Sequence, residues 1–155
     1  MYRPLEKIVN FYQIDEYIGT SGQPEIKQFK DISTEGFEVI INLALSDSPN
    51  AIEDENEIIR KLNMEYVHIP VDFRSPTIED FEFFSEHMEK YRNKKIFIHC
   101  VMNWRVSAFM FLYHTIKCHM PIIDARRHMI AVWQPEPVWQ EFINNSLNTY
   151  GINTD

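Results

Sequence analysis

The sequence has little glycine, little cysteine and no long run of apolar residues. It contains 4 glycines and 2 cysteines in 155 residues, and two cysteines do not make a framework of disulfide bonds. No window approaches the roughly 18 consecutive apolar residues that indicate a membrane-spanning helix. The first residues also lack the apolar core of a signal peptide. We therefore expect a protein of the reducing cytoplasm that has no membrane partner.

The sequence is also poor in positive charge. Its 15 Lys and Arg residues are outnumbered by 23 Asp and Glu residues, which gives a formal net charge of −8. Because no basic run occurs along the chain, we expect no nucleic-acid partner. An anionic substrate would need a local positive site in this otherwise repelling field.

The apolar content is sufficient for one folded core. Hydrophobic residues make up 45% of the chain and aromatic residues 14%, as in folded globular proteins. A chain of this length fits one domain, and we find neither internal repeats nor low-complexity segments. The sequence therefore predicts a single domain over residues 1–155.

Short apolar stretches alternate with amphipathic ones along the first hundred residues. Strands are expected at residues 17–22, 37–43, 64–70 and 95–99, and helices at residues 24–33, 51–62 and 77–91. In the first of these helices, Ile26, Phe29 and Ile32 mark the expected buried stripe. The alternation predicts an α/β fold with a mainly parallel central sheet and helices on both faces. A helical C-terminal part is expected to follow, with helices at residues 105–117, 122–133 and 138–148.

The stretch from His99 to Arg105 carries the strongest chemical signal. An apolar strand ends just before Cys100 and an apolar helix follows, so the thiol lies at a helix N-terminus. Unpaired N–H groups and the helix dipole favour the thiolate there and bind phosphate oxygens. Arg105 adds a planar fork of donors that matches two oxygens of such an anion. This combination predicts covalent phosphoryl transfer.

His99-Cys100 followed by Arg105 and Ser107 resembles the signature loop of the cysteine-dependent protein tyrosine and dual-specificity phosphatases. In that family, His-Cys is followed by five residues, an arginine, and then Ser or Thr. Here only Val101, Met102, Asn103 and Trp104 separate Cys100 from Arg105, and the central glycine of the family is missing. We expect Asn103 to take the left-handed conformation in its place, because Asn tolerates positive φ.

The resemblance extends beyond the loop. Together with it, Thr20–Pro24, Val39–Leu43 and Val67–Phe73 are similar in order to a bacterial phosphatase-like family with a shortened Cys-x4-Arg loop. The likeness covers roughly residues 12–147 and implies a cysteine-phosphatase-like fold for the whole domain.

The resemblance also implies roles for the loop residues. Cys100 would be the nucleophile, and Arg105 would bind the phosphoryl oxygens together with the loop residues Val101, Met102, Asn103 and Trp104. His99 would steady the loop by hydrogen bonding. Ser107 would assist the sulfur as a leaving group, although a small residue at a helix contact explains it equally well.

Hydrolysis of a phosphoester also needs a proton for the leaving oxygen. Asp72 follows a strand in the segment where related phosphatases carry a mobile acid loop, and it is the expected general acid. Glu79 and Asp80 are rivals, but their place in the first turn of a helix is a sufficient structural explanation. Cys100 and Asp72 both follow strand ends, so a parallel sheet would bring them to the same edge.

We expect neither metal nor cofactor, because the six histidines show no paired ligand spacing. The expected substrate is a phosphorylated protein or a small phosphoester. Two alternatives stay open: an inactive phosphatase-like module that binds phosphate or phosphoproteins, and a rhodanese-like sulfurtransferase, which also places a cysteine at a strand–helix junction. The sequence decides neither the substrate nor the oligomeric state.

Overall fold

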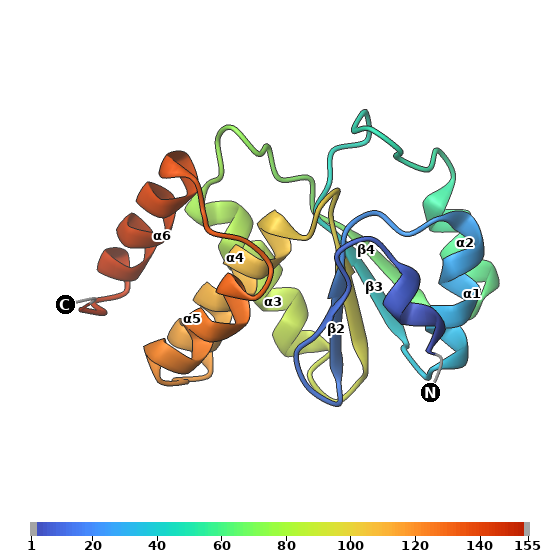
Figure 1. The fold of residues 1–155 in the computed structure, drawn as a ribbon, viewed down its shortest axis with the longest axis horizontal. Coiled ribbons are helices and arrows are strands. Elements are labelled where there is room, and N and C mark those ends of the chain that lie inside the picture. The colour runs from blue at the N-terminus through green and yellow to red at the C-terminus, as the bar shows by residue number, and fades with distance from the viewer. Residues whose placement is uncertain (1–2, 154–155) are drawn as a thin grey trace.

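A computed structural model describes residues 3–153 and shows a five-stranded sheet between two layers of helices (Figure 1). The strands are β1 (Tyr12–Gln13), β2 (Ile18–Ser21), β3 (Val39–Asn42), β4 (Glu65–His68) and β5 (Ile96–His99). Their order across the sheet is β1-β2-β5-β3-β4, and only the edge pair β1–β2 is antiparallel. The predicted mainly parallel sheet is confirmed, with the two-residue strand β1 as an addition.

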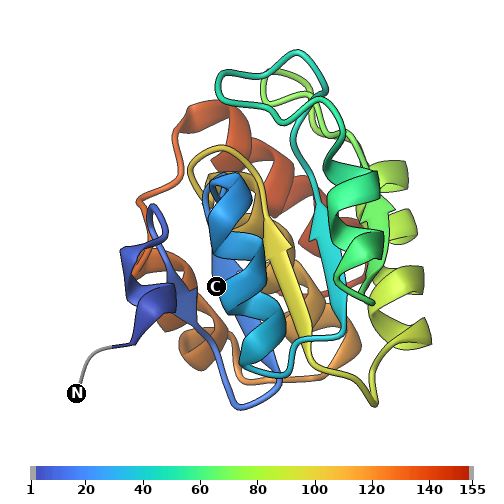
Figure 2. The same cartoon turned by 90° about the vertical axis from the view of Figure 1, so that its right-hand side faces the viewer.

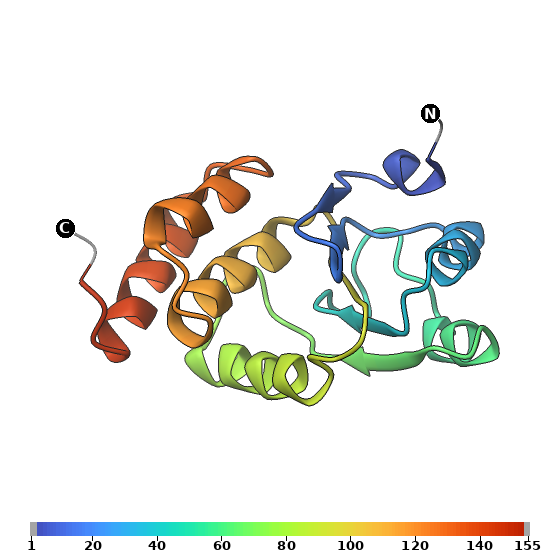
Figure 3. The same cartoon turned by 90° about the horizontal axis from the view of Figure 1, so that it is seen from below.

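Helices cover both faces of the sheet, as predicted (Figures 1 and 3). One face carries the 3-10 helix η1 (Pro4–Lys7), α1 (Ile26–Thr34) and α2 (Glu55–Lys61). The other side carries α3 (Ile78–Lys90), α4 (Trp104–Leu112), α5 (Ile122–Ile130) and α6 (Pro137–Thr149), and the π-helical turn η2 (Tyr113–Lys117) extends α4. None of the helices within residues 3–153 is long and apolar enough to cross a membrane.

The central strands are buried on both faces, which explains their continuous apolar sequences. Along β3, Val39 and Ile41 enter the core formed with α3 to α6, whereas Ile40 enters the core formed with η1, α1 and α2. In β5, Phe97 joins Ile40 in this second core. Successive side chains of a strand point to opposite faces, so each strand contributes to both cores.

Several helix ends follow local signals in the sequence, and others differ from the prediction: α1 begins at Ile26 and α5 ends at Ile130. Thr77 caps α3, since its Oγ1 accepts a hydrogen bond from the Asp80 N–H at 3.1 Å, and Gly36 ends α1 with a φ of +94°. The prediction for Ile26 was wrong: its side chain is 57% exposed, because it opens the first turn of α1 and Gln28 is buried there instead. Helix α2 also begins at Glu55, later than the predicted residue 51.

The carboxyl ends of the parallel strands meet at one edge of the sheet, the upper edge in Figure 1. Figure 2 shows the loops that follow β3, β4 and β5 close together above this edge. The loop after β4 contains Asp72 and the loop after β5 contains Cys100. The expected meeting of these two segments at one edge is confirmed.

Candidate active site

The cysteine loop, residues 100–105, joins β5 to α4. Asn103 has a φ of +69° and lies just before the first residue of α4, which confirms the left-handed conformation predicted for it. Its Nδ2 donates hydrogen bonds to the Asn10 carbonyl at 2.9 Å and to Thr20 Oγ1 at 3.0 Å. The side chain that replaces the family's glycine therefore ties the loop to the N-terminal part of the chain.

The carbonyl groups of the loop are held by neighbouring segments. The Val101 carbonyl accepts a hydrogen bond from the Gln23 N–H at 3.0 Å. The Met102 carbonyl accepts one from Asn10 Nδ2 at 3.0 Å. With these oxygens occupied by donors from residues 10 and 23, the loop backbone has a fixed orientation.

The N–H groups of the loop, by contrast, are free. We find no hydrogen bond from the N–H groups of Val101, Met102 and Asn103 to any of residues 3–153. The N–H groups of Trp104 and Arg105 belong to the first turn of α4, where N–H groups have no partner inside the helix. A row of free N–H groups beside a thiol at a helix N-terminus is suited to bind an anion.

One cavity of about 510 Å³ brings the main predicted residues together. Cys100, Arg105 and Asp72 all line it. The other lining residues are Leu45, Asp47, Ser48, Pro49, Phe73, Arg74, Val101, Met102 and Trp104. The predicted nucleophile, anion-binding arginine and acid therefore share one space, and three of the four intervening loop residues border it.

Ser107 is not brought to this cavity. Its hydroxyl donates a hydrogen bond to the Trp104 carbonyl at 3.0 Å, and the residue lines a small separate cavity with Tyr12 and His128. Because the loop has one residue fewer, position 107 lies two residues after the arginine instead of one. On a helix, this difference of one residue is a rotation of about 100° relative to the arginine. The position directly after the arginine, where the related phosphatases carry their hydroxyl, is occupied by Val106.

Arg105 is buried and contacts the segment that carries Asp72. Its Nη1 donates a hydrogen bond to the Val71 carbonyl at 2.9 Å, and its guanidinium carbon lies 5.8 Å from the centre of the Phe73 ring. We find no partner for its other N–H groups within residues 3–153. One edge of the guanidinium is thus anchored, and the other donors are available to an anion.

The Phe73 ring lies in a cluster of three tryptophans. Its centre is 6.0 Å from those of Trp104 and Trp133 and 5.7 Å from that of Trp139. Trp104 and Trp133 stack in parallel at 5.1 Å, and Trp139 Nε1 donates a hydrogen bond to the Phe73 carbonyl at 2.8 Å. Trp104 therefore lines the cavity and also packs against Trp133, in the segment between α5 and α6.

A buried ion-pairing contact lies behind the cysteine loop. His99 Nε2 is 2.7 Å from Glu55 Oε2, and both side chains are almost completely buried. His99 Nδ1 is 3.2 Å from the Cys100 carbonyl oxygen, and Gln23 Nε2 donates to the other Glu55 oxygen at 3.1 Å. Burial raises the pKa of Glu55, but attraction to His99 and the hydrogen bonds from His99 and Gln23 outweigh it and leave the pKa below its ordinary 4.5.

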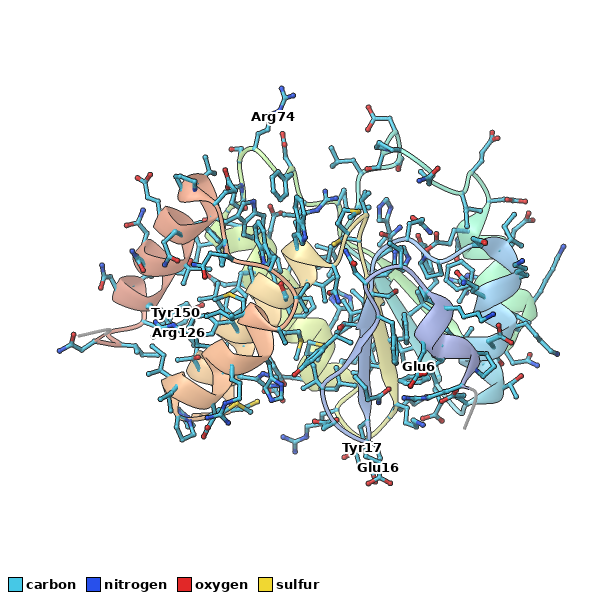
Figure 4. All side chains as sticks on the ribbon, in the orientation of Figure 1. Glu6, Glu16, Tyr17, Arg74, Arg126 and Tyr150 are labelled. Atoms are coloured by element: carbon cyan, nitrogen blue, oxygen red, sulfur yellow. The ribbon has the colours of Figure 1, made fainter. Side chains whose placement is uncertain are left out.

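Several residues of this region were missed by the sequence analysis. Glu55 lies in an acidic helix, a pattern typical of an exposed surface, and Asp47 and Arg74 lie in loops without a recognisable motif. Figure 4 shows the Arg74 side chain extending outward from the loop after β4. No group of three or more His, Cys, Asp or Glu residues within residues 3–153 is arranged to hold a metal ion.

Comparisons with known proteins show that the fold is that of the cysteine phosphatases. A family model described as "DSP-PTPase phosphatase fused to NAD+ Kinase" matches residues 14–136. A crystal structure from Shewanella putrefaciens CN-32, described as "Putative phosphatase (DUF442)", is 31% identical, with a TM-score of 0.85 and coverage of 96% of this chain and 97% of that chain. The chain belongs to this dual-specificity-phosphatase-like family.

More distant structures share the fold alone. Tk-PTP is 18% identical with a TM-score of 0.72, and the match covers 90% of this chain and 97% of that chain. PTPMT1 in complex with PI(5)P is 13% identical with a TM-score of 0.76, and the match covers 90% and 96% of the two chains. Among curated proteins, no significant match is found.

Proposed function

We propose that the protein is a cysteine-dependent phosphatase of the tyrosine or dual-specificity type, acting through a phosphocysteine intermediate. The observation that carries the proposal is the shared cavity, in which Cys100, Arg105 and Asp72 line the same 510 Å³. The free N–H groups of the loop support it, because they can hold the oxygens of a phosphoryl group next to the thiol. The proposal treats residues 1–155 as one phosphatase domain.

In the first step, the Cys100 thiolate attacks phosphorus and the bond from phosphorus to the leaving oxygen breaks. Asp72 donates its proton to that oxygen, so the product leaves as a neutral alcohol or phenol. Arg105 and the loop N–H groups bind the non-bridging oxygens, whose charge they balance in the transition state. The result is a phosphoryl group bound covalently to the sulfur.

In the second step, the Asp72 carboxylate takes a proton from a water molecule, and the water oxygen attacks phosphorus. The bond from phosphorus to sulfur breaks, inorganic phosphate is released and the thiolate is restored. Asp72 is thereby protonated again and ready for the next cycle. The substrate would be a phosphorylated protein or a small phosphoester, and the two free cysteines suit a reducing cytoplasm.

The position of Ser107 favours a second candidate, a phosphate-binding module without turnover. Its hydroxyl is bonded to the Trp104 carbonyl, so it is not available to stabilise the sulfur as a leaving group. Such a module would keep the anion site of the loop but would not complete the second step.

Hydrolysis of p-nitrophenyl phosphate separates the two candidates. We expect Cys100→Ser to abolish turnover. With phenyl phosphate, whose poor leaving group needs the proton, we expect Asp72→Asn to reduce turnover by about a hundredfold to ten-thousandfold, the usual contribution of a general acid. Cys118→Ser, which removes the exposed second thiol, is the matched control and should leave turnover unchanged. Vanadate binding by a wild-type protein that hydrolyses nothing would identify the binding module instead.

A further inference from the structure

The backbone on both sides of Asp72 is held by side chains from other elements. The carbonyl before it, that of Val71, accepts a hydrogen bond from Arg105 in α4 at 2.9 Å. The carbonyl after it, that of Phe73, accepts one from Trp139 in α6 at 2.8 Å. Asp72 thus lies between two anchored peptide groups, one of them attached to the anion-binding arginine.

The Asp72 carboxylate itself has no such anchor. It is exposed, and the one side-chain hydrogen bond that we find for it within residues 3–153 is a local one, from the Arg74 N–H at 2.9 Å. The location of the carboxylate therefore depends on where the backbone of residues 71–73 lies. That backbone depends in turn on Arg105 and Trp139.

Trp139 is fixed well enough to serve as an anchor. Its side chain is completely buried. Its backbone N–H donates a hydrogen bond to Glu136 Oε1 at 3.0 Å, which caps the N-terminus of α6. The rings of Phe109 and Phe142 pack against the indole with centres 6.0 and 5.5 Å away. Aromatic contacts of this kind stabilise a defined ring orientation, so the Nε1 donor points at the Phe73 carbonyl in a set direction.

From these contacts we propose that Trp139 is a positioning residue for the general acid. It does not line the cavity of Cys100 and Asp72, and it acts by holding the Phe73 carbonyl so that Asp72 reaches the leaving oxygen. The inference rests on the proposed function, since it assigns Trp139 a part in the same reaction. It also gives the C-terminal helix α6 a direct link to the chemistry.

The test compares Trp139→Phe with the matched control Trp133→Phe. Both tryptophans contact the Phe73 ring at similar distances, but Trp133 Nε1 has no hydrogen-bond partner within the described residues. Both substitutions remove an indole from the same cluster, and only one removes a hydrogen bond to the acid segment. If Trp139→Phe does not fold, Trp139→Met takes its place, because a flexible Met side chain fills irregular space.

The readout is the dependence of kcat/KM on the leaving group, because kcat/KM reports formation of the phosphocysteine and not the second step, which is the same for every substrate. Phenyl phosphate has a poor leaving group and needs the proton, whereas p-nitrophenyl phosphate has a good one and needs it less. We expect Trp139→Phe to lower kcat/KM for phenyl phosphate by about tenfold, within the loss that a small misplacement causes, and to affect kcat/KM for p-nitrophenyl phosphate far less. Vanadate affinity should not change, and Trp133→Phe should keep the wild-type ratio of the two kcat/KM values.

A double-mutant cycle completes the experiment. In an Asp72→Asn background there is no acid to position, so adding Trp139→Phe should have no further effect on kcat/KM for phenyl phosphate. Equal losses with both substrates, or full additivity with Asp72→Asn, would show a purely structural role and overturn the inference. A wild-type protein without turnover would overturn the proposed function itself, an outcome that the variants of Trp139 cannot mimic.

Discussion

Gly22 lies directly against the carbonyl group of Val101. A Cβ atom on Gly22 would be 2.3 Å from the Val101 oxygen and 2.8 Å from Val9 Cγ1, closer than real Cβ atoms come to other heavy atoms. The same Val101 oxygen accepts the hydrogen bond from the Gln23 N–H. Residue 22 is therefore glycine because the strand β2 segment and the cysteine loop approach each other too closely for any side chain.

The first prediction concerns Gly22→Ala. The added methyl group must displace the Val101 carbonyl, and we expect a loss of about 1–3 kcal/mol in the free energy of unfolding together with weaker vanadate binding. Vanadate inhibition and thermal unfolding measure the two effects. Gly19→Ala is the control, because a Cβ there would meet the rings of Phe97 and Phe37 instead. It should cost stability without changing vanadate affinity, and equal effects of the two variants on vanadate binding would contradict the assignment.

The second prediction concerns Glu55→Ala. The substitution removes one partner of a buried pair and leaves His99 Nε2 without its acceptor, which should cost about 3–5 kcal/mol in the free energy of unfolding. Glu57→Ala, at an exposed position of the same helix, should change it by less than about 0.5 kcal/mol. Urea unfolding at neutral pH checks both values.

The same pair has a pH signature. Because the pKa of Glu55 in the folded protein lies below its ordinary 4.5, the carboxylate contributes stability above about pH 4.5. This contribution is lost as the pH falls below that value, since the unfolded chain then binds the proton more tightly. The wild-type protein should therefore lose stability more steeply than Glu55→Ala below pH 4.5, and parallel curves would contradict the role of the pair.

The third prediction concerns His114, a buried residue of η2 that does not line the cavity of the cysteine loop. Burial and the nearby His128 lower its pKa from 6.5 to about 4. The folded protein therefore favours the neutral form of His114. The stability that this preference contributes is fully present above pH 6.5 and is lost as the pH falls toward 4. At about 1.4 kcal/mol per pKa unit, the loss amounts to about 3 kcal/mol.

Urea unfolding at pH 7 and pH 5 tests this expectation. His114→Phe should remove most of the stability difference between pH 7 and pH 5, because position 114 then has no imidazole that could be protonated in the unfolded chain. The exposed His119 provides the comparison: His119→Asn, which suits the positive φ at that position, should keep the wild-type difference. A wild-type protein equally stable at both values would refute the role of His114.

Local signals in the sequence were enough for most of the fold and for choosing three residues, Cys100, Arg105 and Asp72, that line one cavity. The apolar run before Cys100 predicts β5, Thr77 predicts the start of α3, and the short spacing from Cys100 to Arg105 predicts the anion site. The partners that complete the site come from distant segments. Glu55 is 44 residues from His99 and Trp139 is 66 residues from Phe73, and an acidic helix or an isolated tryptophan has a sufficient explanation without any site. The contacts of such residues depend on how distant segments pack together, and a local sequence pattern contains no information about that packing.

The bonds that shape the cysteine loop also have a consequence for how the protein is made. The hydrogen bonds of Asn103 join it to Asn10 and Thr20, across 93 and 83 positions of the chain. Contacts over such separations form late in folding, because the intervening chain must first be ordered. On the ribosome, residue 10 is synthesised long before residue 103 emerges. A nascent or partly folded chain therefore carries the Cys100 thiol in a loop that has not yet taken its final shape, and the conformation of this loop reports on completion of the whole fold.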